Sequence, residues 1–181
     1  MKNFNHIMID IETLGTNPGS VILSIGAVSF NLETGETGKE FFRNIKLQDS
    51  LDLGLKIDGD TLAWWMNNKA EAFKMSTDNG ESLLTVLDDL YEFIRHSGVN
   101  KTFVWGNSNR FDLGLLEAVY DKVPGIPTPW NFRNERDVRT LVAFAPEIKD
   151  NWKKVGVEHH GLSDCINQIG YCSAIWNYLK K

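Results

Sequence analysis

The sequence contains few cysteines and no long apolar run. Its two cysteines, Cys165 and Cys172, lie seven positions apart on one amphipathic segment. On a helix they would face the same side but stand too far apart for an easy disulfide. We therefore expect two reduced core thiols in a cytoplasmic protein. Neither a run of 18 apolar residues nor a signal peptide is present, so the sequence indicates neither export nor a membrane.

An excess of basic residues is also missing, since the formal net charge is −5. This charge argues against a tight, non-specific clamp on duplex nucleic acid. It does not exclude a nucleic-acid enzyme whose acidic pocket is neutralised by metal ions. The 181 residues are 42% hydrophobic and 24% charged, which is typical of a soluble globular chain. We expect a single domain over residues 1–181.

The hydrophobic pattern predicts strands first and then alternating helices and strands. Residues 5–12, 20–30 and 39–47 read as an antiparallel meander, and residues 101–107 as a fourth, short strand. Helical spacing predicts four helices, at residues 60–75, 80–98, 110–123 and 163–179. Residues 136–144 fit either a strand or a helix. This order predicts an α/β fold, with a mixed sheet flanked by helices.

Two acidic residues, Asp10 and Glu12, interrupt the isoleucines of "HIMIDIETLG". On a strand they project from one face while Ile9 and Ile11 project from the other. Two unit charges ~4 Å apart repel by roughly 4 kcal/mol at an effective dielectric of 20, so the pair requires a cation or a raised pKa. Carboxylate oxygens suit Mg²⁺ or Mn²⁺. The alternative is a solvated edge strand with two surface acids.

Three further residues complete a candidate constellation. Asp112 falls in the first turn of a predicted helix, directly after an apolar strand, and Asp164 begins the last helix. His159 precedes Asp164 by five positions. Each has an ordinary structural explanation, because a first-turn acid gains about 0.3–1 kcal/mol from the helix dipole and a loop histidine is common.

Together the pattern resembles the DEDDh branch of the 3′–5′ exonucleases, the DnaQ-like or RNase T superfamily. "IDIETLG" is similar to the first motif of that family, and "HHGLSDC" to its H-x-A-x-x-D motif, with Gly161 where alanine is more frequent. "TLAWW" and "RDVRT" resemble a sub-branch of phage exodeoxyribonucleases and mycobacterial-type exoribonucleases.

The resemblance implies a ribonuclease-H-like fold with a five-stranded mixed sheet and two divalent ions, Mg²⁺ or Mn²⁺. Asp10 would bridge both ions, Glu12 and Asp164 would complete the first site, and Asp112 would serve the second. His159 would be the general base for the attacking water. The neighbouring His160 is the other candidate, but the five-residue offset to Asp164 matches His159.

The resemblance also suggests residues that contact substrate. Thr13 would offer its backbone near the 3′-hydroxyl, and Leu14 would lie against the last base. One of Trp64 and Trp65 would be core and the other could stack on a base, and we favour Trp65 for stacking.

Three polar positions could reach a phosphate, namely Asn109, Arg110 and Arg139, although a structural or surface role is equally open for each. Asp137 reads as a structural hydrogen-bonding acid rather than a metal ligand.

The expected function is therefore release of nucleoside 5′-monophosphates from single-stranded 3′ ends, with DNA slightly favoured. The alternatives are an exoribonuclease, an oligoribonuclease-type phosphodiesterase for very short substrates, and a non-catalytic nucleic-acid-binding module. The last is disfavoured because all five catalytic positions are intact. Relatives are often dimers, so a homodimer is open. The expected setting is the cytoplasm of a bacterium or of a phage-infected host cell.

Overall fold

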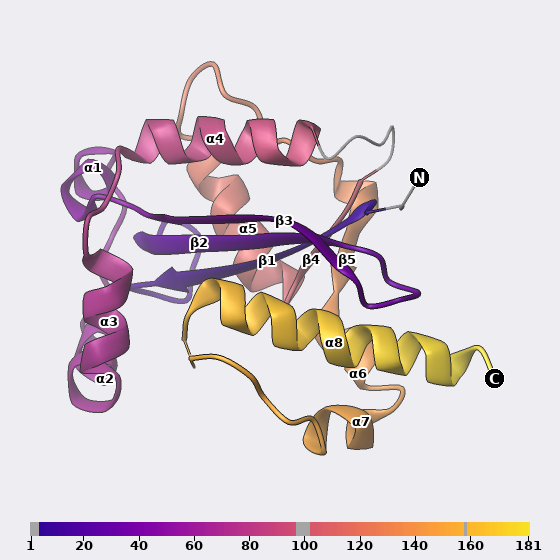
Figure 1. Cartoon of the computed structure of the whole chain (residues 1–181). Coiled ribbons are helices and arrows are strands. Elements are labelled where there is room, and N and C mark those ends of the chain that lie inside the picture. The colour runs from indigo at the N-terminus through magenta and orange to yellow at the C-terminus, as the bar shows by residue number, and fades with distance from the viewer. Residues whose placement is uncertain (1–3, 97–101, 158) are drawn as a thin grey trace.

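The computed structural model describes residues 4–96, 102–157 and 159–181. The chain forms a five-stranded sheet in the order β3-β2-β1-β4-β5 (Figure 1). The strands are β1 His6–Thr13, β2 Ile22–Phe30, β3 Thr37–Asn44, β4 Phe103–Gly106 and β5 Glu135–Asp137. β1 pairs antiparallel with β2 and parallel with β4, which confirms the predicted mixed sheet. Because β1 is the central strand, the alternative of a solvated edge strand is wrong.

Helices cover both faces of this sheet, with α4 and α5 on one side and α6, α7 and α8 on the other (Figure 1). The helices are α1 Leu47–Asp52, α2 Gly59–Asn68, α3 Ala70–Thr77, α4 Leu83–Arg95, α5 Asn109–Tyr120, α6 Val138–Val142, α7 Pro146–Asp150 and α8 Gly161–Leu179. A short 3₁₀ turn, Phe132–Asn134, precedes β5.

The structure corrects several of the predicted elements. The helix expected over 60–75 breaks at Lys69 into α2 and α3. The ambiguous segment 136–144 contributes the end of β5 and all of α6. α1 and α7 were not predicted, because helices this short carry too few turns for a periodic signal. The expected helix end at Gly98 and the expected strand start at Lys101 lie outside the described residues.

The alternation along β1 separates two apolar cores. Ile7, Ile9 and Ile11 face the core under α4 and α5, whereas Met8 faces the core under α8. Asp10 and Glu12 follow Met8 on the α8 face, and Glu12 is only 8% exposed. The acids therefore lie between the sheet and a helix, not on an open surface.

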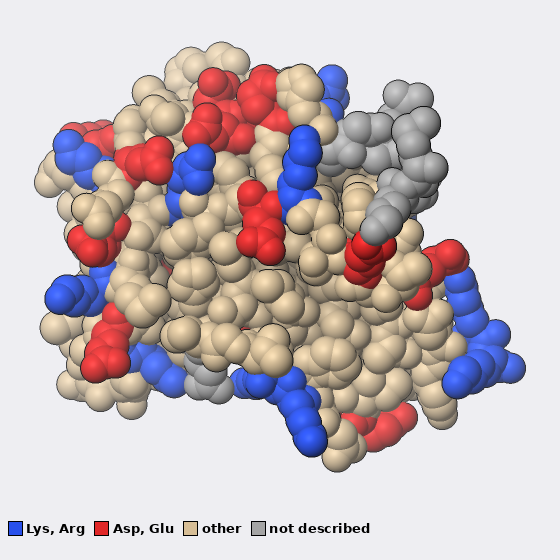
Figure 2. All heavy atoms as spheres, viewed as in Figure 1, with Lys and Arg blue, Asp and Glu red and all other residues tan. Residues whose placement is uncertain are grey.

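α8 packs across β1 and β2, and Asp164 is its single charged residue between Gly161 and Leu179. Figure 2, seen from the same side as Figure 1, shows charged side chains of both signs over the upper part and the margins, and few of them where α8 lies. Both cysteines lie on α8 as buried free thiols. None of the described helices combines the length and apolarity that a membrane span requires.

Candidate active site

Three of the predicted acids converge between β1 and the first turn of α8. One carboxylate oxygen from each of Asp10, Glu12 and Asp164 lies within 4.8 Å of the others. β1 supplies two of them through its alternation, and α8 supplies the third from 152 residues further along the chain. An all-carboxylate donor set suits a hard divalent cation such as Mg²⁺ or Mn²⁺. When no cation is bound, the three carboxylates repel one another strongly in their ionised forms.

Two glycines allow α8 to approach the sheet this closely. Gly26 of β2 pairs with Asp10, and a Cβ added at Gly26 would stand 2.5 Å from the backbone carbon of Gly161. A Cβ added at Gly161 would in turn meet Gly26 at 3.0 Å. The glycine that departs from the family's usual alanine is thus a close-packing residue. Gly26 was missed by the sequence analysis, although an isolated glycine inside an apolar strand is the usual sign of a close backbone approach.

Asp112 joins the acids from the opposite edge of β1. The pairing of β1 with β4 stops at Met8 and Trp105, and beyond it the Ile11 N–H donates to Asp112 Oδ1 at 3.3 Å. The Asn107 N–H donates to the other oxygen, Oδ2, at 2.6 Å. Asp112 is 2% exposed, so both oxygens are fixed in the interior by backbone donors.

Burial and mutual repulsion raise the pKa of these carboxyls. The pKa of Glu12 rises from 4.5 to about 8, first because the group is buried and then because Asp164 and Asp112 stand nearby. Burial raises the pKa of Asp112 to about 7, against the opposing effects of its two backbone donors and of Arg139. The pKa of Asp10 also lies well above its usual range, through burial and then the neighbouring acids. The cluster is therefore poised to exchange protons for a metal ion.

The two adjacent histidines point to different surroundings. His159 lines a pocket together with Glu12 and contacts the rings of Trp64 and Trp65, at centroid distances of 5.6 and 5.9 Å. Its backbone is in the left-handed region, with φ of 57°, a conformation that costs a non-glycine residue about 1–3 kcal/mol. His160 instead stacks on Phe42 of β3, with ring centroids 4.5 Å apart. This placement favours His159 as the base, because His160 is packed against β3 and is only partly exposed.

Two polar side chains beside the acids were not predicted. Gln168, one helical turn after Asp164, donates from Nε2 to Asp10 Oδ1 at 2.8 Å. Within the described part of the chain, Gln168 Oε1 is buried and accepts no hydrogen bond, and the buried Ser24 hydroxyl, on the residue that pairs with Glu12, also makes none. Buried oxygens without partners are rare, and here they fit a bound, hydrated cation whose water molecules would donate to them.

Comparison with known proteins decides the family. The domain described as 3'-5' exoribonuclease Rv2179c-like matches residues 5–176. The chain belongs to this family. It is a metal-dependent 3′–5′ exonuclease of the DEDDh type, with an RNase H-like fold.

Solved structures share the fold of this exonuclease at low sequence identity. The nuclease domain of 3'hExo, solved with rAMP, is 13% identical over 96% of this chain and 92% of its own, with a TM-score of 0.61. S. pombe Pop2p, solved with Mg²⁺ and Mn²⁺, is 14% identical over 95% and 82%, with a TM-score of 0.63. E. coli Exonuclease I, solved with a dA16 oligonucleotide, is 16% identical over 97% of this chain but only 42% of its own, with a TM-score of 0.67. No curated protein sequence matches the chain.

The pocket that holds His159 opens directly beside the acids of this exonuclease. We call it the histidine pocket, and its volume is about 470 Å³. It is lined by Ile11, Glu12, Thr13, Thr16, Asp60, Thr61, Trp64, Trp65, Phe111 and His159. Glu12 therefore belongs both to the carboxylate cluster and to the wall of this pocket.

Two predicted substrate contacts are corrected by burial. Trp65 is 2% exposed, and its indole Nε1 donates to the Thr13 carbonyl at 2.9 Å, so it has no open face for stacking. Trp64 is 43% exposed and is the tryptophan of this pair whose ring is open to solvent. Leu14 is 1% exposed and belongs to the core under α4 and α5, so it does not lie against a base. Thr13 lines the histidine pocket, and its contact with the 3′-hydroxyl stays a prediction.

The polar residues near Asp112 differ in what they contact. The Asn109 side chain lies beside Glu135, at 3.4 Å, and its backbone N–H donates to Asp137, so it does not enter the histidine pocket. Arg110 is exposed at the start of α5. Arg139 donates to the Asn107 carbonyl at 3.4 Å, close enough for its charge to lower the pKa of Asp112. Asp137 caps α6 through Thr140, which agrees with the structural role expected for it.

The raised pKa values predict an unusual pH dependence for the metal-free exonuclease. A carboxyl whose pKa is higher in the folded chain than in the unfolded chain stabilises the fold below the unfolded pKa, and this contribution is lost as the pH rises through the folded pKa. For Glu12 and Asp112 that window runs from about 4 to about 8. We expect the melting temperature in chelator to fall by about 4–8 °C between pH 5.5 and pH 8. Millimolar Mn²⁺ at pH 8 should restore it, and a melting temperature that is flat or rising in chelator would contradict the assignment.

Proposed function

We propose that this exonuclease releases nucleoside 5′-monophosphates one at a time from single-stranded 3′ ends by a two-metal mechanism. One observation carries the proposal: the carboxylates of Asp10, Glu12 and Asp164 lie within 4.8 Å of one another and adjoin a pocket that contains His159. Asp112 is held on the far side of the same strand by backbone donors. Four carboxylates and one imidazole are the groups that two-metal hydrolysis of a phosphodiester uses.

Each residue of the site has a distinct role in the proposed mechanism. Asp10 would lie between the two ions, with Glu12 and Asp164 on one side and Asp112 on the other. The bound ions supply Lewis acidity, which lowers the pKa of water and offsets charge on the phosphate. His159 accepts the proton of the attacking water at its imidazole nitrogen. Gln168 holds the Asp10 carboxylate in place through its hydrogen bond.

The histidine pocket would receive the terminal nucleotide. The exposed ring of Trp64 offers a face for the last base, a contact worth ~1–3 kcal/mol that tolerates any sequence. The Thr13 backbone lies on the same wall and would approach the 3′-hydroxyl. The histidine pocket, with a volume of about 470 Å³, would hold the end of one strand, so we expect a paired end to fray before it enters.

For the sugar, we favour RNA over the slight preference for DNA that the sequence suggested. The matched family is described as exoribonuclease, and the pocket wall carries the polar side chains of Asp60 and Thr61, which can pair with a 2′-hydroxyl. The histidine pocket alone does not set a minimum substrate length, so an oligoribonuclease-type activity is the second candidate.

The test is incubation with 5′-labelled single-stranded RNA and DNA of one sequence, with Mg²⁺ or Mn²⁺, beside an Asp10→Ala variant. A ladder that shortens from the 3′ end, and that chelator and the variant abolish, is the expected result. Faster loss of RNA than of DNA supports the ribose assignment, and a series of two to twenty nucleotides separates a general exonuclease from one limited to short oligomers. Cleavage by purified Asp10→Ala at the wild-type rate would refute the mechanism.

A further inference from the structure

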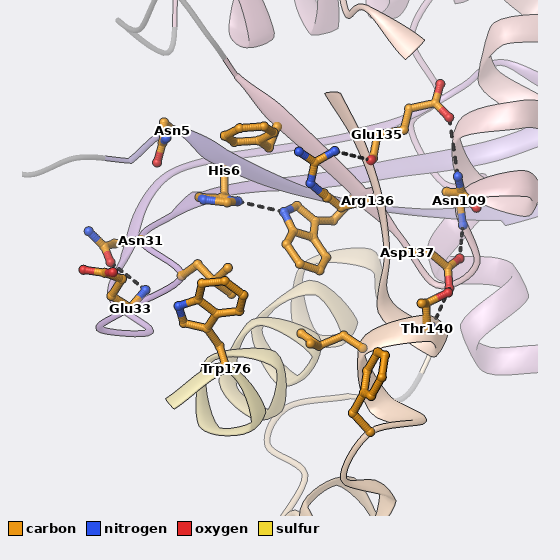
Figure 3. Close-up of a pocket in the computed structure, with 15 residues that line it drawn as sticks. Asn5, His6, Asn31, Glu33, Asn109, Glu135, Arg136, Asp137, Thr140 and Trp176 are labelled. Atoms are coloured by element: carbon orange, nitrogen blue, oxygen red, sulfur yellow. Dashed lines mark hydrogen bonds between the residues drawn. The ribbon is translucent and has the colours of Figure 1, made fainter. Parts of the chain in front are cut away.

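A second cavity, of about 720 Å³, lies at the other end of β1 from the acids, on the side of the sheet that α8 covers (Figure 3). Its walls include Trp105 of β4, Trp176 of α8 and Phe144, which follows α6. Figure 3 shows His6, Arg136 and Trp176 gathered around one space from three different elements. We call it the aromatic cavity. Neither the acids nor His159 line it, so the mechanism above does not use it.

The chemistry of the walls favours a flat, uncharged, hydrogen-bonding ring. The Trp105 indole N–H donates to His6 Nδ1 at 2.9 Å, which leaves the proton of a neutral His6 on its other ring nitrogen. Burial, and then the nearby charge of Arg136, lowers the pKa of His6 to about 4, so the ring is neutral at pH 7. The exposed ring of Phe144 and the partly exposed ring of Trp176, beside a neutral donor, are surroundings that suit a nucleobase.

The rim of the aromatic cavity is tied to the loop that carries Asp112. Asn109 and Asp137 both line the cavity, and the Asn109 N–H donates to Asp137 at 2.8 Å. Asp137 is on β5, two strands from β1, which is about 10 Å at the usual strand spacing. Even at the stacked spacing of about 3.4 Å per nucleotide, a strand whose 3′ end lies on the acids covers this distance in about three nucleotides.

Positive charge lines the same route. Four of the six arginines of the chain lie on β5 or on elements next to it: Arg133 in the turn before β5, Arg136 on β5, Arg139 in α6 directly after it, and Arg110 at the start of α5, which contacts β5. Arg139 reaches the Asn107 carbonyl next to the acids, and Arg136 lies over the Phe103 ring at the cavity, 4.3 Å from its centroid. Three acids line the cavity and each already has a partner within the protein: Glu135 accepts from Trp130, Asp137 from Thr140, and Glu33 from Lys180. In a chain with a net charge of −5, this edge is suited to phosphates.

We propose that the aromatic cavity is a second base-binding subsite, which receives a base about three nucleotides 5′ to the 3′ end while the arginine edge binds the phosphates between. The proposal rests on the exonuclease function proposed above and adds a length preference to it. Oligomers that reach the aromatic cavity bind more tightly than those that fill the histidine pocket alone.

Two exposed phenylalanines provide a matched pair of variants. Phe144 is 66% exposed and lines the aromatic cavity, whereas Phe132 is 65% exposed on the same edge and does not line it. We expect Phe144→Ala to raise KM about tenfold for tetranucleotides and hexanucleotides, with kcat and the KM of dinucleotides unchanged. Phe132→Ala should change none of these values. An equal effect at every length, no effect at any length, or the same effect in both variants would overturn the subsite.

A binding measurement separates this subsite from the activity. Oligonucleotides that carry one 5-iodouracil at successive positions are crosslinked by light to the wild-type protein in chelator, and the products are mapped by mass spectrometry. Crosslinks from the third or fourth nucleotide to the peptides of Phe144 or Trp176 support the proposal, and crosslinks only elsewhere refute it. If wild-type protein cleaved no substrate, the proposed function would fail, yet the crosslinks would still report on the subsite.

Discussion

Replacing Glu12 with glutamine is expected to lower kcat by about 10³-fold while making the metal-free protein more stable at pH 8. Glutamine keeps the shape of the side chain but removes one charge from the carboxylate set that faces the cation. Losing about 4 kcal/mol of the stabilisation that metal ions provide corresponds to a 10³-fold slower reaction. Saturating kinetics with Mn²⁺ on a single-stranded substrate measure this loss.

The gain in stability follows from the same charge. The pKa of Glu12 is raised to about 8. At pH 8 and above, ionised Glu12 therefore destabilises the folded, metal-free protein. Glutamine carries no charge and avoids this destabilisation. We expect an increase of about 2–4 kcal/mol in the free energy of unfolding, or about 5–10 °C in melting temperature. Glu40→Gln, which removes an exposed acid of β3, is the control for charge alone and should change neither property. If Glu12→Gln destabilised the metal-free protein, the proposed repulsion among the acids would be refuted.

The second large effect is expected for Gly26→Ala, a change of one methyl group on a strand that contributes no acid. The new Cβ would stand 2.5 Å from the Gly161 backbone, so the start of α8 has to move away from β2. Asp164 moves with it, because it sits in the first turn of α8. Displacement of a catalytic group by about 1 Å can cost 10²-fold in rate, and overpacking of this kind typically costs 1–3 kcal/mol in stability.

The diagnostic measurement for Gly26→Ala is Mn²⁺ affinity by calorimetry, with circular dichroism to verify the fold. We expect a folded protein with Mn²⁺ affinity and kcat each reduced at least about tenfold. Gly59→Ala is the matched control, since a Cβ added at the start of α2 meets no atom within 4 Å. A folded Gly26→Ala protein with wild-type metal affinity would show that α8 does not need this close approach.

The sequence was sufficient for those parts of the site that depend on local spacing. The alternation of β1 placed Asp10 and Glu12 on one face, and the start of a helix placed Asp112 and Asp164. The wrong expectations concern burial, which depends on contacts between distant segments. Trp65 is buried because its indole reaches Thr13, 52 residues away, and Leu14 because the core under α4 and α5 covers it. Neither contact leaves a trace in the spacing of nearby residues.

The second layer of the site was equally inaccessible from sequence. Gln168 looks like any polar residue on a helix until α8 is placed against β1. The aromatic cavity combines residues of β1, β4, α8 and the segment after α6, which no single periodic pattern connects. Gly26 was the exception, since a glycine in a β-branched strand already signals an unusual neighbour.

The two tryptophans of α2 have different surroundings, since Trp65 is buried against the central strand and Trp64 is exposed. The Trp65 indole nitrogen donates to the Thr13 carbonyl of the central strand, and this contact anchors α2 beside β1, whereas the Trp64 ring one position earlier is exposed. Trp64 can therefore be exchanged for other side chains without loosening the scaffold. Replacing the outer ring while keeping the inner one is expected to change the affinity for the terminal nucleotide on an unchanged framework, which makes this position the natural starting point for redesigning substrate binding.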